Sequence, residues 1–137
     1  MTTADDTAQR HQLTALARGL RDLHKHLIEV EAQYFGAVGS TLELLQLVTN
    51  HPHFAWLQKL SALMAQMDER LDDEEPLGAT DAATFRRAFE SLIGPSEQGD
   101  LEFRAKYNAL LHDAPEIVMA HAAVRKLLAA IEVPAGA

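Results

Sequence analysis

The stretch from residue 13 to residue 34, LTALARGLRDLHKHLIEVEAQY, decides the fold. Its apolar residues recur at alternating steps of three and four, the heptad spacing of helices that pack lengthwise against other helices. We expect this helix to begin near residues 5–7, where Asp can supply an N-cap, and to end at Gly36 or Gly39. It would be about 45 Å long. The seam consists of Leu13, Leu16, Leu20, Leu23, Leu27, Val30 and Tyr34.

A proline separates two predicted helices in the next part of the chain. Ser40 and Glu43 have the spacing of a capping box, which opens a short helix that ends before Pro52. Proline is tolerated at the first position of a helix, so the same residue can start the next one. Apolar residues then step again by four and three, which predicts a helix over 52–71.

Three further helices are expected after residue 79. Thr80 and Asp100 are candidate caps for the first two, and the segment DAPE at 113–116 opens the last, which reaches about residue 131. No segment alternates polar and apolar residues with the period of a strand. The sequence therefore predicts an all-α protein, an antiparallel four-helix-bundle-like single domain with Pro-split helices. Its limits would be 1–137, with flexible tails at 1–8 and 133–137 and an acidic loop at 72–79.

Length and composition narrow the class of protein. The chain has 137 residues, 47% hydrophobic and 23% charged, which fits one globular domain. It has no cysteine, which excludes disulfides, thiolate metal sites and cysteine nucleophiles. Its acidic start lacks the pattern of a secretory signal, and no run of about 18 apolar residues is present. We expect a cytoplasmic protein with no membrane segment.

Acidity is the strongest compositional signal. The chain carries 12 basic and 20 acidic residues, a formal charge of -8, which argues against nucleic acid as a partner. The segment DERLDDEE at 68–75 concentrates this charge. It could be a solvated loop, or it could meet a positively charged protein surface. The candidate contact residues are Asp72, Asp73, Glu74 and Glu75.

Three of the seven histidines lie on or beside apolar seams. His24 flanks the seam of the first helix, with Glu31 two turns later, and His53 and His121 fall on the seams of their own helices. One interpretation is a histidine at the core edge that is hydrogen-bonded to a carbonyl or carboxylate. The other is a ligand site, because helical bundles bind metals and haem through inward-facing imidazoles. The candidate ligand residues are therefore His24, His53, His121 and Glu31.

The patterns of known metal sites are missing. The chain has no ExxH pair of the di-iron type, and His51 and His53 would point in nearly opposite directions on a helix. No cofactor is predicted, and haem or a non-haem metal is kept as an alternative. No nucleophile motif or Gly-rich phosphate loop is present, so no catalytic residue is predicted.

Aromatic residues near helix ends suggest an interface. On a short amphipathic helix, Phe54 and Trp56 are two residues apart and would not both face one core. One of them must then pack elsewhere, against the short helix before Pro52 or against another subunit, and an exposed Trp beside apolar neighbours is typical of interfaces. The candidate contact residues are Trp56, Phe54 and Tyr34. The heptads of the first helix could serve a dimer in the same way, or they could pack within one chain.

The segment FAWLQKLSALMAQMDERLDDEEP resembles a group of small bacterial proteins in which a DPxFAWLxPLSxL segment leads into IDE and an acidic stretch ending in proline. The segments LRDLHKHL and HAAVRKLL extend the resemblance to about residues 13–128. The chain departs from the pattern at His51, where the group has Asp, and at Lys59, where it has Pro. The resemblance implies a bacterial cytoplasmic setting and no particular chemistry.

Together these features predict a noncatalytic binding or interaction protein. We expect a homodimer, or a protein partner that contacts the acidic segment. The alternative is a helical bundle that binds a small ligand, haem or a metal through its interior histidines.

Overall fold

The computed structural model describes residues 4–33, 40–50, 52–94 and 99–133. These residues form six α-helices and one 3₁₀-helix, and no strand occurs among them, which confirms the all-α prediction. The elements are α1 (Ala4–Ala32), α2 (Thr41–Asn50), η2 (Pro52–Leu57), α3 (Gln58–Asp72), α4 (Ala79–Ile93), α5 (Leu101–Asp113) and α6 (Pro115–Ala129). Within the described residues, no helix is both long and apolar enough to cross a membrane.

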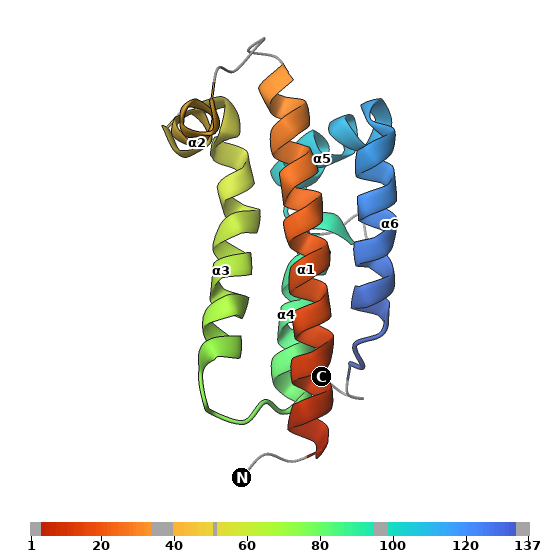
Figure 1. Cartoon of the computed structure of the whole chain (residues 1–137). Coiled ribbons are helices and arrows are strands. Elements are labelled where there is room, and N and C mark those ends of the chain that lie inside the picture. The colour runs from red at the N-terminus through yellow and green to blue at the C-terminus, as the bar shows by residue number, and fades with distance from the viewer. Residues whose placement is uncertain (1–3, 34–39, 51, 95–98, 134–137) are drawn as a thin grey trace.

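α1 is the central helix of the bundle. Figure 1 shows α3, α4 and α6 lying alongside it, with α3 and α6 running in the opposite direction to α1. The predicted seam faces this centre: Leu13, Leu16, Leu20, Leu23 and Leu27 have no exposed surface. Val30 is also buried, and Tyr34 lies outside the described residues. The heptads therefore serve packing within one chain.

α1 and α6 approach each other closely at Gly19. A Cβ at this position would lie 2.8 Å from Leu127 Cδ1 and 3.4 Å from Val124 Cγ2. The absence of a side chain lets the two helices pack with little space between them.

The helix boundaries follow capping chemistry. Ser40 Oγ accepts a hydrogen bond from the Glu43 amide at 3.1 Å, and Asp100 Oδ1 accepts one from the Phe103 amide at 3.0 Å, as expected for N-caps. Thr80 is not the cap of α4. That helix begins at Ala79, and the Asp81 side chain accepts from the Gly78 amide at 3.0 Å.

Two expectations are corrected at the ends of the chain's longest elements. Residues 4–8 are not a tail, because α1 begins at Ala4 and Asp6 is buried. The expected helix over 52–71 is divided into η2 and α3, although the acidic segment does end α3, at Asp72. Residues 73–78 then connect α3 to α4 as the expected acidic loop.

The expected exposure of Trp56 or Phe54 is also wrong. Phe54 has no exposed surface and Trp56 is 8% exposed. A helix that packs on one side only would leave one of these side chains uncovered, but η2 contacts α1, α2 and α3. Side chains that point in different directions from η2 are therefore both covered.

The seam of α1 makes a direct test of this packing. Leu20 has no exposed surface and Leu42 on α2 is 63% exposed. We expect Leu20→Ala to lower the free energy of unfolding by about 2–5 kcal/mol, because it removes buried methyl groups and leaves a cavity. Leu42→Ala is the matched control and should change it by less than about 1 kcal/mol. Urea unfolding measures both, and equal effects would contradict the packing described.

Candidate functional site

A buried carboxylate lies near the end of α1. Glu31 is 5% exposed, and its Oε2 accepts a hydrogen bond from Trp56 Nε1 at 3.0 Å. His53 Nε2 lies 3.0 Å from the same oxygen. A buried negative charge near a helix C-terminus opposes the helix dipole and requires donors. The Trp56 indole supplies one such donor, and the His53 ring lies against the same oxygen, so two side chains of η2 contact the end of α1.

A small pocket opens beside these three residues. Its volume is about 280 Å³, and its lining comes from α1, η2 and α5. It combines the Glu31 carboxylate, the His53 ring and the exposed Lys106 with an apolar wall. The lining residues are Glu31, His53, Trp56, Lys106, Ala109 and Leu110.

His121 lies at the other end of a row of aromatic rings. The ring centroids of Trp56 and Phe103 are 5.0 Å apart, and those of Phe103 and Tyr107 are 6.0 Å apart. Tyr107 Oη lies 2.7 Å from His121 Nδ1. Burial raises the pKa of Tyr107 well above its usual range, against the opposing charge of Arg125. Burial also lowers the pKa of His121, so both groups are neutral near pH 7.

The predicted ligand residues are thus brought together only in part. His53 meets Glu31, whereas His121 is bonded to Tyr107 as a histidine at the core edge. His24 lies on α1, and no hydrogen bond between described residues joins it to either pair. Among the described residues, no group of three or more His, Asp or Glu side chains is placed to hold a metal ion.

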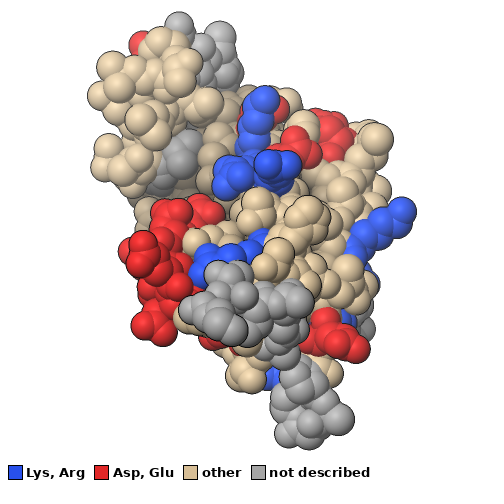
Figure 2. Space-filling view, turned by 60° about the horizontal axis from the view of Figure 1, so that its bottom comes forward, with Lys and Arg blue, Asp and Glu red and all other residues tan. Residues whose placement is uncertain are grey.

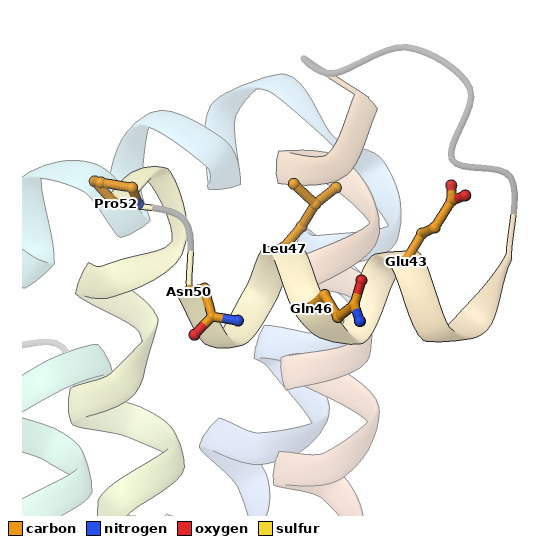
Figure 3. A pocket seen from close by; sticks show the side chains of 5 residues that line it. All are labelled: Glu43, Gln46, Leu47, Asn50 and Pro52. Atoms are coloured by element: carbon orange, nitrogen blue, oxygen red, sulfur yellow. The ribbon is translucent and has the colours of Figure 1, made fainter.

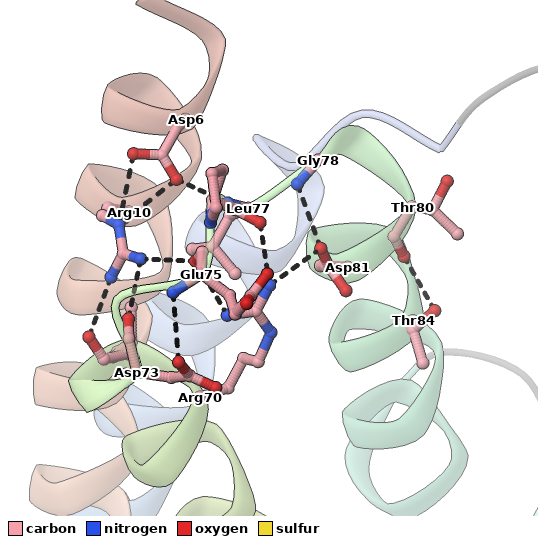
Figure 4. A network of polar contacts seen from close by, with 12 residues as sticks. Asp6, Arg10, Arg70, Asp73, Glu75, Leu77, Gly78, Thr80, Asp81 and Thr84 are labelled. Carbon is pink, nitrogen blue, oxygen red and sulfur yellow. Dashed lines mark hydrogen bonds and ion pairs between the residues drawn. The ribbon is translucent and has the colours of Figure 1, made fainter. Parts of the chain in front are cut away.

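The acidic end of the molecule is the region around residues 72–75, and Arg10 binds its backbone (Figure 4). Its guanidinium donates to the carbonyls of Leu71 at 2.8 Å, Asp73 at 2.9 Å and Glu75 at 2.8 Å. The bond to Leu71 satisfies a carbonyl in the last turn of α3, which has no partner within the helix. Arg10 Nε also contacts Asp6 Oδ1 at 3.2 Å. One arginine of α1 therefore fixes the backbone of a loop more than 60 residues away in sequence.

Asp6 and Arg70 complete this arrangement. The Leu77 amide donates to Asp6 Oδ1, and this bond, with the charges of Arg10 and Arg70, holds the pKa of Asp6 below its ordinary value. Arg70 donates to the carbonyls of Glu75 at 3.0 Å and Pro76 at 2.9 Å. We call Asp6, Arg10 and Arg70 the arginine clamp.

The clamp turns the acidic side chains outward. Both guanidiniums bond mainly to backbone carbonyls, while the carboxylates of the loop remain exposed. Figure 2 shows acidic side chains gathered at this end of the molecule. A pocket with a volume of about 420 Å³ lies here. It is lined by Asp6 and Arg10 of α1 and by residues 71–74 and Pro76. The exposed acidic residues are Asp72, Asp73, Glu74 and Glu75, the candidate contact residues.

α2 carries a second surface, which is apolar. Leu42 and Leu45 are 63% and 60% exposed. A pocket of about 550 Å³ lies along the helix, lined by Glu43, Gln46, Leu47 and Asn50 of α2 and by Pro52 at the start of η2 (Figure 3).

The sequence did not reveal the clamp or the exposed leucines. Asp6 and Arg10 are four apart on a helix, which suggests only a local pair. Their partners at residues 71–77 become visible only in the fold.

Comparison with known proteins gives no relative. No family model, no curated protein and no solved structure matches the chain. The resemblance to small bacterial proteins therefore stays a prediction, and function must be argued from the chain's own residues.

The two partly buried histidines predict a pH dependence. Burial lowers the pKa of His24 and of His121 below the ordinary 6.5, so the unfolded chain takes up protons at a higher pH than the folded one. The contribution of these two histidines to the free energy of unfolding is therefore fully present above about pH 6.5, and it is lost as the pH falls below that value. We expect urea unfolding to show this loss as the pH is lowered from about 6.5 to about 5.5.

Replacing both residues, His24→Gln with His121→Gln, should make the stability less dependent on pH over this interval. The matched control is the double variant of two exposed histidines, His11→Gln with His112→Gln. A steeper slope in the first variant than in the control would show the predicted sign to be wrong.

Proposed function

We propose that this protein is a noncatalytic binding protein whose acidic end recognises a positively charged surface of a protein partner. One observation carries the proposal: four consecutive exposed carboxylates, on Asp72 at the end of α3 and on the first three residues of the following loop, stand beside loop carbonyls that are held by Arg10 and Arg70. A loop that is already ordered loses less conformational entropy when it binds. Exposed charges of one sign steer an oppositely charged partner and select its register.

The charge of the chain supports the same kind of partner. With a net charge of -8, the protein repels polyanions, so a Lys- and Arg-rich protein segment is a better ligand than nucleic acid. The proposal also includes self-association. Because Trp56 and Phe54 are buried, a second copy would have to use another surface.

A labelled peptide rich in Lys and Arg tests the proposal by fluorescence anisotropy. The triple variant Asp72→Asn/Glu74→Gln/Glu75→Gln removes three exposed charges and leaves Asp73, which accepts from the Glu75 amide at 3.1 Å. We expect about tenfold weaker binding, since charged rim contacts contribute modestly each. The control Asp113→Asn/Glu116→Gln/Glu132→Gln removes the same charge from other exposed positions and should bind nearly as the parent protein.

The variant Arg10→Gln distinguishes binding that requires a fixed loop from binding by electrostatic attraction alone. It makes the chain more negative, so attraction alone predicts tighter binding of the basic peptide. Loss of the three carbonyl bonds should instead loosen the loop and weaken binding. Tighter binding by this variant, or equal losses in the two triple variants, would contradict the proposal.

The pocket beside Glu31 favours a second candidate function, binding of a small ligand. Its support is a buried carboxylate, a histidine and a lysine converging on one cavity with an apolar wall. A metal ion or haem iron would find His53 and Glu31 as donors there, although Glu31 Oε2 already accepts from Trp56.

The single tryptophan lines this pocket and gives the readout. We expect Trp56 fluorescence to change when haem or Zn²⁺ is titrated into untagged protein, and this change to be lost in His53→Gln but kept in His11→Gln. An absorption spectrum and elemental analysis of the purified protein accompany the titration. No bound species and no spectral change with either probe would end this candidate.

A further inference from the structure

α2 presents an apolar face that its own chain does not cover. Leu44 and Leu47 are partly buried against the core, whereas Leu42 and Leu45 are more than half exposed. Residues three apart lie on the same side of a helix, so each pair forms one face. Single exposed leucines are ordinary, but two adjacent ones on a ten-residue helix make a contact surface.

Charge decides which occupant fits this face. α2 has one charged residue, Glu43, among ten. In Figure 1 it lies at the opposite end of the molecule from the loop between α3 and α4, where the acidic side chains gather. A cationic partner would find few carboxylates here. Two copies of this chain, each with a charge of -8, bring fewer carboxylates together when they meet through α2 than when they meet through the acidic loop.

The neighbouring polar groups suit a symmetric contact. Gln46 and Asn50, which carry both donors and acceptors without charge, line the pocket next to Leu47 together with Glu43, the one charged residue of α2. In a two-fold pair the same surface of each copy meets its equivalent, so leucines meet leucines and amides meet amides.

We propose that α2 is the contact surface of a reversible homodimer, in which Leu42 and Leu45 of each copy pack together. This inference names the surface for the proposed self-association and does not depend on the binding of a basic partner. A helix of ten residues is about 15 Å long and buries less than the roughly 800 Å² per partner of a standard stable interface. The dimer is therefore weaker than one with a standard interface and forms only as the protein concentration rises.

Sedimentation velocity over a range of protein concentrations tests the proposal. The parent protein should change from monomer to dimer as its concentration rises. Leu42→Gln/Leu45→Gln keeps a good helix former at both positions and should dimerise at least about tenfold more weakly. The control Leu101→Gln/Met119→Gln replaces residues that are 68% and 75% exposed on α5 and α6, and it should dimerise as the parent does.

A chain without cysteine allows a second readout. Leu45→Cys places one thiol at the proposed contact, and mild oxidation should give a cross-linked dimer. Met119→Cys is the control at a more exposed position elsewhere and should give much less. A parent protein that stays monomeric at the highest concentration, or equal behaviour of the α2 variants and their controls, would overturn the proposal.

The same variants distinguish this inference from acidic-end binding. Leu42→Gln/Leu45→Gln should bind the basic peptide as the parent does, because the clamp and the loop are unchanged. Added salt should strengthen the dimer by screening repulsion and weaken peptide binding by screening attraction. Loss of one property with retention of the other would identify which proposal fails.

Discussion

The contact on which the acidic end depends is the set of hydrogen bonds between Arg10 and the carbonyls of Leu71, Asp73 and Glu75. Four consecutive carboxylates, on Asp72 at the end of α3 and on the first three loop residues, repel one another, and the only buried hydrophobic residue of the loop is Leu77, which is 2% exposed. Arg10 and Arg70 remove this difficulty by binding the backbone and leaving the carboxylates in solvent. Buried Asp6 in turn pairs with Arg10, so the arrangement is satisfied at each member.

α1 connects this end to the opposite one. Its middle is an uninterrupted apolar seam, while its buried carboxylates, Asp6 and Glu31, lie near its two ends. Glu31 holds η2 through Trp56 and His53, and η2 in turn supports α2. One long helix therefore positions the acidic end, the small pocket and the apolar α2 surface, and it keeps the charged and apolar surfaces apart.

The sequence predicted those features that depend on near neighbours in the chain. The heptads gave α1, and the caps at Ser40 and Asp100 and the break at Pro115 gave helix boundaries. It could not give contacts made by tertiary packing. The Tyr107–His121 bond joins two helices, and the bonds of Arg10 span more than 60 residues. Trp56 was misjudged because burial of η2 depends on several elements at once.

The order of the loop itself is the most direct test of the account, because both the exposed carboxylates and their fixed register depend on it. ¹⁵N relaxation of the amides of Asp73, Glu75 and Leu77 measures this order on the picosecond-to-nanosecond timescale. We predict order parameters of about 0.85, equal to those of α1 and α3, since the clamp holds the backbone at both carbonyls and amides. Values below about 0.6 at these amides would show a mobile acidic loop and contradict the account.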